Sequence, residues 1–236
     1  MIAVGFDFDH TLAIDNKLER TVALEMLADL AQRFGVTYDK AAAEAAIDET
    51  LHSYRSGGVP VETAIEGFFL QFVDQGEAIA EEVTFFRDRC VERAREFVRG
   101  LPGLRDTLAA LDAMHVRYAM LTNGWSPLQE EKARLIGFEA PVYVSERLGV
   151  MKPERAAFDS LVHLFDLPPA DIWYVGDDPA VDCAGAKAAG MTAVWFDWEN
   201  RSYPQGLMQP DYTIHTLDEL PDLLQGHASK VANPAE

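Results

Sequence analysis

The chain has 236 residues, of which 48% are hydrophobic and 25% are charged. A chain of this size and composition can bury a large core, so global disorder is excluded. Its 20 basic and 39 acidic residues give a formal net charge of −19, which argues against a nucleic-acid backbone or an anionic bilayer as the principal partner. The sequence has no run of roughly 20 apolar residues, and its N-terminus shows no basic leader before Phe6–Asp9. We therefore expect a cytoplasmic protein.

The cysteine content and the net charge restrict the chemistry further. Cys90 and Cys183 are the only cysteines, and neither belongs to a CxxC pair, so we expect buried free thiols. An anionic substrate would gain no long-range attraction from an acidic protein. Local cations would have to hold such a substrate.

The first predicted element is a strand at residues 1–8, whose apolar residues show no polar alternation until its end, as in a strand that is covered on both faces. Apolar residues then recur at helical spacing over residues 17–34, and Gly35 stands where a helix ends. Further helices are expected at 38–51, around Phe68–Phe72 and at 79–99. Nothing between about residue 15 and residue 98 resembles a strand, which predicts an α-helical insertion.

Strands and helices alternate after Pro102. The expected helices are 104–114, 127–136, 154–165, 180–189 and 217–224, and the expected strands are 116–121, 142–144, 172–175, 192–196 and 212–214. This alternation predicts an α/β fold: a parallel sheet with helices on both faces and ligands at the carboxyl ends of its strands. We predict an α/β core domain from residues 1–14 and 99–225, an α-helical domain from 15–98 and a flexible tail from 226–236.

Two acidic residues, Asp7 and Asp9, stand at the end of the first strand. The period of two along a strand places both carboxylates on the same side as the chain leaves the sheet. Two charges about 4 Å apart at an effective dielectric near 20 repel by about 4 kcal/mol. The pair therefore needs a cation or a shared proton, unless both acids are simply solvated in a loop.

Other polar groups follow the neighbouring strands. Thr122 and Asn123 end one strand, and Asp177 and Asp178 end another. Pro153 suits the first position of a helix, which would leave Lys152 just outside the helix and directed over the strand ends. Taken singly, these residues have ordinary interpretations as caps or solvated side chains, but together they predict one polar site.

The order Asp7-x-Asp9-x-Thr11, Thr122-Asn123, Lys152-Pro153 and Gly176-Asp177-Asp178-x-x-x-Asp182 resembles the four motifs of the haloacid dehalogenase (HAD) superfamily of hydrolases. The resemblance covers about residues 1–14 and 100–198. The helical stretch between the first two motifs is similar to the small α-helical cap of phosphoglycolate phosphatase-like members. The resemblance implies a HAD-like Rossmannoid sheet with an inserted cap. One departure is His10, where relatives commonly have Gly, and this difference alters the turn after the strand.

The resemblance also implies that Asp7 attacks a phosphoryl group and becomes a phosphoaspartate, which water hydrolyses. An alkoxide leaving group needs a proton, and Asp9 is placed to supply it and later to deprotonate water. The repulsion between the phosphate and several acids calls for a divalent cation. Mg²⁺ is the expected cofactor, held by the side chains of Asp7 and Asp177, and the resemblance implies that the backbone carbonyl of Asp9 is a further ligand.

The remaining motif residues are expected to bind phosphate or to support the site. Thr122, the backbone N–H of Asn123 and Lys152 would hold the phosphate oxygens. Asp182 would orient Lys152 or bind a metal-bound water. The expected supporting positions are Thr11, Asp178 and Asp182.

The predicted function is a magnesium-dependent phosphatase for a small phosphorylated metabolite. Three alternatives stay open: a phosphomutase, a 2-haloacid dehalogenase and, in a different class, a phosphoaspartate regulatory switch. Dehalogenation is disfavoured because halide leaves without a proton, whereas Asp9 is present. His52, Tyr54 and Arg55 are candidates for reading the substrate. The sequence predicts neither the particular phosphate ester nor the oligomeric state.

Overall fold

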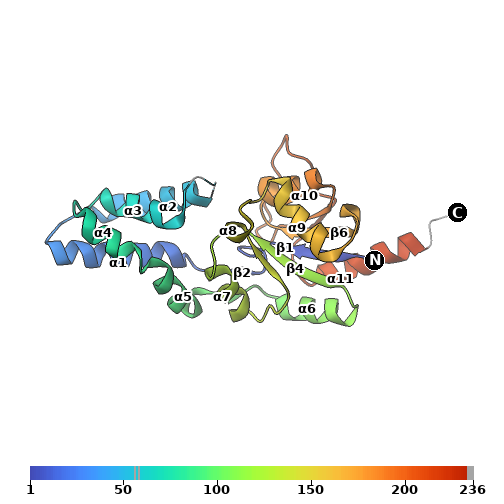
Figure 1. The fold of residues 1–236 in the computed structure, drawn as a ribbon. Coiled ribbons are helices and arrows are strands. Elements are labelled where there is room, and N and C mark those ends of the chain that lie inside the picture. Colours follow the sequence, from blue (N-terminus) through green and yellow to red (C-terminus); the bar gives the residue numbers. More distant parts are fainter. Residues whose placement is uncertain (56, 58, 233–236) are drawn as a thin grey trace. The chain divides into compact units, whose positions relative to one another are not determined.

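A computed structural model describes residues 1–55, 57 and 59–232 of the chain. These residues form two compact units, which are described separately (Figure 1). The α/β unit consists of Met1–Ile14, Arg99–Asn123 and the chain from Ala133 onward. The helical unit consists of Asp15–Val98 and Gly124–Lys132. Ser56 and Gly58, beside the candidate substrate-reading residues, lie outside the described part.

The α/β unit is built on a six-stranded sheet with the strand order β5-β4-β1-β6-β7-β8, in which every neighbouring pair is parallel. The strands are β1 (Ala3–Phe6), β4 (Arg117–Thr122), β5 (Val142–Val144), β6 (Ile172–Gly176), β7 (Thr192–Phe196) and β8 (Tyr212–Ile214). All four residues of β1 are buried, as expected for a central strand covered on both faces. The predicted parallel α/β sheet is therefore confirmed.

Helices cover both faces of this sheet, α9 and α10 on one side and α6 and α11 on the other (Figure 1). The alternation of side chains along β6 shows why. Tyr174 packs edge-on against Phe158 of α9, with ring centroids 5.1 Å apart. Its neighbour Trp173 points to the opposite face, where it packs against His227 of α11. The helices of the chain after the helical insertion are α6 (Leu104–Ala113), α7 (Leu128–Leu135), α8 (Ser145–Leu148), α9 (Arg155–Phe165), α10 (Ala184–Ala189) and α11 (Glu219–Ala232).

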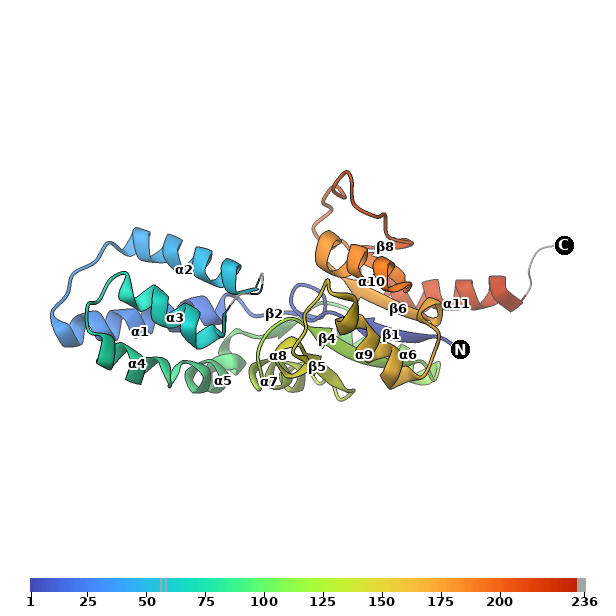
Figure 2. The ribbon, with the colours of Figure 1, turned by 45° about the horizontal axis from the view of Figure 1, so that its top comes forward.

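The helical unit contains α1 (Leu18–Phe34), α2 (Lys40–Arg55), α3 (Val61–Leu70), α4 (Gly76–Val83) and α5 (Phe86–Phe97) (Figure 2). Helix α1 ends as predicted at Gly35, whose positive φ of 65° lets its N–H reach the last free carbonyls. Buried residues at helical spacing along α1, such as Val22, Met26 and Leu30, supply the unit with an apolar core.

Two short strands lie where the chain leaves the α/β unit and where it returns. These strands, β2 (Ala13–Ile14) and β3 (Arg99–Gly100), pair in antiparallel fashion. These strands are not predictable from the sequence, because two residues carry no recognisable pattern. Leu101 adds a further backbone bond, from its N–H to the carbonyl of Leu12 at 2.9 Å.

The structure differs from the expected boundaries in several places, and one of them is the helix expected at 79–99, which is divided into α4 and α5. Helix α11 continues to Ala232, where a flexible tail was expected from residue 226, because His227 packs against Trp173 and anchors the last turns. Residues 233–236 of that expected tail lie outside the described part. Residues Gly124–Lys132, expected in the α/β core, group instead with the helical unit. None of the described helices combines the length and the hydropathy that a membrane-spanning segment needs.

Candidate active site

Three carboxylates come together at the carboxyl edge of the sheet. Asp7 follows β1 and Asp177 follows β6, while Asp182 lies five residues further on, in a π-helical turn at Pro179–Cys183. The N–H of Asp7 donates to the carbonyl of Val175 at 2.9 Å, which keeps Asp7 beside β6 after β1 has ended. Carboxylate oxygens of the three residues lie within 4.8 Å of one another. Such a cluster needs positive charge.

Lys152 supplies part of that charge. Its ammonium donates to Asp7 Oδ1 at 2.6 Å and to Asp182 Oδ1 at 2.7 Å, with a side chain that is only 2% exposed. The prediction that Pro153 begins the following helix is wrong: α9 begins at Arg155 and is preceded by Glu154 as its N-cap. Lys152 therefore lies in the loop three residues before the helix, and it still reaches the strand ends.

The electrostatics of the cluster follow from burial. Burial raises the pKa of Asp7 to about 7, against the opposing effect of Lys152 and with further repulsion from Asp182. Burial, then Asp7 and Asp182, raise the pKa of Asp177 to about 8. Burial alone would lower the pKa of Lys152, but Asp182 and Asp7 hold it well above its usual value. The single positive charge of the Lys152 ammonium does not balance the negative charges of three ionised carboxylates.

Asn123 and Lys152 are joined by two reciprocal hydrogen bonds. The Asn123 side chain donates to the Lys152 carbonyl at 2.9 Å and accepts from the Lys152 N–H at 2.9 Å. This pair ties the end of β4 to the loop that carries the ammonium. Thr122, the last residue of β4, is buried beside it. The motif indicates a role only for the backbone N–H of Asn123, and its side chain has this further contact.

Asp178 and Asp182 organise the turn that follows β6. Asp178 caps this turn, because its Oδ1 accepts hydrogen bonds from the N–H groups of Ala180 and Val181, both at 2.8 Å. The Oδ2 of Asp182 accepts from the N–H of Asp178 at 3.0 Å, while its Oδ1 binds Lys152. Asp182 thus contacts Lys152 and also lies in the three-carboxylate cluster.

The turn after β1 carries the other residues of the first motif. Asp9 is half-buried and does not belong to the three-carboxylate cluster. The atom of Asp9 that is expected to bind the metal is its backbone carbonyl oxygen, not a side-chain oxygen. His10 adopts a left-handed backbone with φ of 62°, the conformation that Gly suits best, and its ring stacks on Trp198 at 6.5 Å. The hydroxyl of Thr11 is buried and has no hydrogen-bond partner within the described chain.

The contacts that Tyr174, Trp195 and Arg201 make at the site have no motif signature. The phenol of Tyr174 donates to the carbonyl of Leu121 at 2.7 Å, and its ring lies 5.4 Å from the Lys152 ammonium. Trp195 and Arg201 both donate to the backbone carbonyl of Asp177. The only signal for Tyr174 is a polar aromatic residue in an otherwise apolar strand, and Arg201 lies in a loop without a pattern.

The candidate substrate-reading residues lie at the end of α2 in the helical unit. Arg55 is engaged there, because it donates to Glu19 at 3.0 Å. The other oxygen of Glu19 accepts from the Trp125 indole at 2.7 Å. His52 is exposed and Tyr54 is half-buried.

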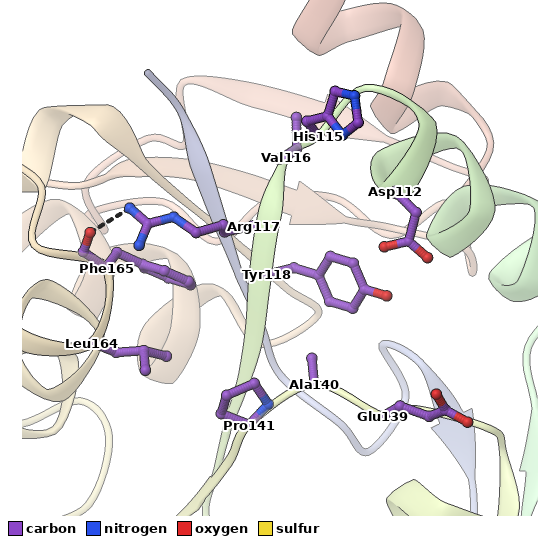
Figure 3. A pocket seen from close by; sticks show the side chains of 10 residues that line it. All are labelled: Asp112, His115, Val116, Arg117, Tyr118, Glu139, Ala140, Pro141, Leu164 and Phe165. Carbon is purple, nitrogen blue, oxygen red and sulfur yellow. Dashed lines mark hydrogen bonds between the residues drawn. The ribbon is translucent and has the colours of Figure 1, made fainter.

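The α/β unit also contains a cavity of about 610 Å³ (Figure 3). It opens at the start of β4, the end opposite to Thr122. In Figure 3, Tyr118 points between Asp112 and Glu139, while Arg117 turns toward Phe165. None of the candidate site residues lines this cavity.

Comparisons with known proteins agree with this architecture. The family model for haloacid dehalogenase-like hydrolases matches residues 1–190. The phosphoserine phosphatase of Thermus thermophilus is 31% identical over 220 residues, which cover 81% of this chain and 86% of the relative. The chain is therefore similar to a curated enzyme over most of both lengths.

Solved structures show the same fold. The 2-haloacid dehalogenase of Pseudomonas syringae pv. Tomato DC3000 superposes with a TM-score of 0.73 at 23% identity, covering 96% of this chain and 99% of the other. The magnesium-bound HAD-hydrolase YfnB of Bacillus subtilis superposes with a TM-score of 0.69 at 19% identity, covering 94% and 98%. At these identities the likeness concerns the fold alone.

Proposed function

The chain belongs to the haloacid dehalogenase-like hydrolases, and from this membership we propose that it is a Mg²⁺-dependent phosphatase that hydrolyses a small phosphoric monoester. The observation that carries the proposal is the cluster of Asp7, Asp177 and Asp182 around the buried Lys152. Carboxylates and an ammonium at the carboxyl edge of a parallel sheet suit a site that binds a cation and an anion side by side.

The donor set fits a divalent cation. Carboxylate oxygens are the ligands that Mg²⁺ prefers, and the pKa values of Asp7 and Asp177 are raised first by burial and then by repulsion between the neighbouring acids. Asp7 and Asp177 would hold the ion, together with the carbonyl of Asp9. When bound, the ion would neutralise charge between these acids and the phosphate oxygens.

In the first step, a carboxylate oxygen of Asp7 bonds to phosphorus and the bond to the leaving oxygen breaks. Asp9 lies two residues further on and donates the proton that the leaving alkoxide requires. Lys152 and Thr122 bind the phosphoryl oxygens and stabilise the charge that develops on them. The alcohol is released, and the phosphoryl group remains on Asp7.

In the second step, Asp9 accepts a proton from water, and the water oxygen bonds to phosphorus. The bond between phosphorus and Asp7 breaks, which releases inorganic phosphate and restores both carboxyl groups. Asp182 and Asn123 keep Lys152 in place throughout, through the contacts to its ammonium and to its backbone.

The test is release of inorganic phosphate from an aryl phosphate ester, with Asp7→Asn as the decisive variant. We expect turnover in the wild type only with Mg²⁺, and a loss of at least about 10³-fold in the variant because the nucleophile is gone. Asp222→Asn, which alters an exposed carboxyl group of α11, is the matched control and should retain activity. Full turnover by Asp7→Asn would refute the nucleophile assignment.

A panel of phosphate esters, assayed for release of inorganic phosphate, would identify the preferred substrate. The panel contains phosphorylated sugars, nucleotides, phosphoserine, phosphoglycolate and glycerol phosphate. Metal-free assays with 2-haloacids belong in the same experiment. Release of halide without release of phosphate would favour dehalogenation, and a phosphoaspartate that persists for minutes would favour a regulatory switch.

A further inference from the structure

The backbone carbonyl of Asp177 accepts hydrogen bonds from two side chains that come from the neighbouring strand β7 and its following loop. The indole Nε1 of Trp195 donates at 3.0 Å, and the guanidinium Nη2 of Arg201 donates at 2.8 Å. A carbonyl oxygen has two lone pairs, so these donors can occupy both of them. The peptide that follows Asp177 is thereby fixed from the β7 side, and with it the direction in which the Asp177 side chain leaves the backbone.

Arg201 is itself held in place. Its N–H donates to Asp197 Oδ1 at 2.9 Å, and its Nε lies 3.5 Å from the same oxygen. The Asp197 side chain is only 2% exposed, so it offers a fixed anchor. The guanidinium also lies over the Trp195 ring, 5.9 Å from its centroid. The two donors therefore support each other.

The guanidinium binds the backbone of Asp177 more closely than its carboxylate. Nη2 lies 3.5 Å from Asp177 Oδ2, which is longer than an ordinary hydrogen bond. The carboxylate thus stays available within the cluster that it forms with Asp7 and Asp182. Two effects of Arg201 on a bound cation oppose each other: its charge repels the cation, and its hydrogen bond orients the ligand.

We propose that Arg201, acting with Trp195, is a positioning residue that orients Asp177 for metal binding, and that this effect outweighs its charge repulsion. The proposal rests on the proposed function, because it assumes that Asp177 is a metal ligand. Outer hydrogen-bond partners of metal ligands typically contribute about 10- to 100-fold to metal affinity, which is larger than the effect of screened repulsion from a partly exposed guanidinium.

The experiment measures Mg²⁺ affinity by calorimetry on the full-length, substrate-free protein. Arg201→Gln removes the repelling charge, so electrostatics alone would make Mg²⁺ bind more tightly. We expect the opposite, a weakening of about 10-fold. Arg201→Lys keeps the charge without the planar fork and should also bind more weakly. Arg105→Gln, an equal change of charge at an exposed position of α6, should bind like the wild type.

Two further measurements separate positioning from a general structural role. The melting temperature without Mg²⁺ shows whether each variant is folded, and the activity of Arg201→Gln should approach that of the wild type at saturating Mg²⁺. Trp195→Phe removes the other donor to the same carbonyl and tests the proposal should Arg201→Gln fail to fold. Combined in one chain, the two substitutions should weaken Mg²⁺ binding by less than the product of their separate effects.

The outcomes are distinguishable. Unchanged or tighter Mg²⁺ binding in folded Arg201→Gln, or wild-type affinity in Arg201→Lys, overturns the proposal while leaving the metal site intact. If the wild type does not bind Mg²⁺, or if Asp177→Asn binds it equally well, Asp177 is not a metal ligand. That result would contradict the metal site of the proposed function, and with it the role of Arg201.

Discussion

Replacement of Lys152 should lower the free energy of unfolding strongly, because its ammonium contacts two buried carboxylates at once. Lys152→Met keeps much of the side-chain volume but leaves Asp7 and Asp182 without their cation. Breaking a buried ion pair from one side costs about 3–5 kcal/mol, and we expect a loss of that size in the free energy of unfolding of the metal-free protein. Urea denaturation at about pH 8 would measure it. A change below about 0.5 kcal/mol would contradict the pairing.

The raised pKa values of Asp7 and Asp177, about 7 and about 8 against an ordinary 3.8, make the site sensitive to pH. Between about pH 4 and pH 8 the folded metal-free protein binds more protons than the unfolded chain at these groups. Their contribution to the free energy of unfolding therefore falls as the pH rises through that window. Metal binding needs the ionised carboxylates, so Mg²⁺ affinity should rise over the same window.

The measurement is the Mg²⁺-induced increase in melting temperature at two pH values. We expect a larger increase at about pH 8.5 than at about pH 6, because fewer protons must be displaced. Asp177→Asn should show little increase at either pH. An increase that is equal at both pH values in the wild type would contradict protonation of the site.

At the level of single residues, the motifs predict the cluster but not its support. Asp7 follows a strand at this edge of the sheet, and a loop and a π-helical turn bring Lys152 and Asp182 to it. The Asn123 side chain and Arg201 contact backbone atoms, and such contacts depend on the path of each loop rather than on a residue pattern. The sequence alone could not reveal them.

At the level of elements, Gly176 shows how tightly the end of β6 packs against the site. A Cβ atom at this position would lie 2.4 Å from the Cβ of Asp182, too close for any real contact. Gly176→Ala should therefore displace Asp182 from Lys152, lower the free energy of unfolding by about 1–3 kcal/mol and reduce phosphatase activity.

Gly67 provides the matched control for this substitution. It lies within α3, and a Cβ added there would meet no atom within 4 Å. Gly67→Ala should stabilise the helix by about 0.5–1 kcal/mol. Chemical denaturation of both variants measures the contrast, and an equal effect of the two substitutions would show that the close contact at Gly176 relaxes freely.

Most of the main elements were predictable because short apolar runs alternate with segments of helical spacing after Pro102. The strands β5, β7 and β8 have the expected bounds, and α1 ends at the expected glycine. The pair β2 and β3 was missed because two-residue strands have no period. The full length of α11 was missed because Gly226 resembles a helix end, whereas the contact between His227 and Trp173 extends the helix.

At the level of the whole molecule, the net charge of −19 should repel an anionic substrate. Raising the ionic strength from about 10 mM to about 150 mM at saturating Mg²⁺ should therefore increase kcat/KM, by about twofold or more, because salt screens the repulsion. The neutral salt is varied while MgCl₂ is held constant. A decrease under these conditions would indicate that local cations dominate the encounter.

The helical unit is built from two separate stretches of the chain, and this affects how the unit can be exchanged between homologues by recombination. The unit combines Asp15–Val98 with the short stretch Gly124–Lys132, which supplies Trp125 to Glu19 and Lys132 to Asp15 at 2.7 Å in each case. Suppose that only the longer stretch were replaced by that of a homologue. Residues 15 and 19 would then come from one protein, while their partners Trp125 and Lys132 came from the other. The two stretches are then expected to be inherited together whenever this helical unit is exchanged between homologues.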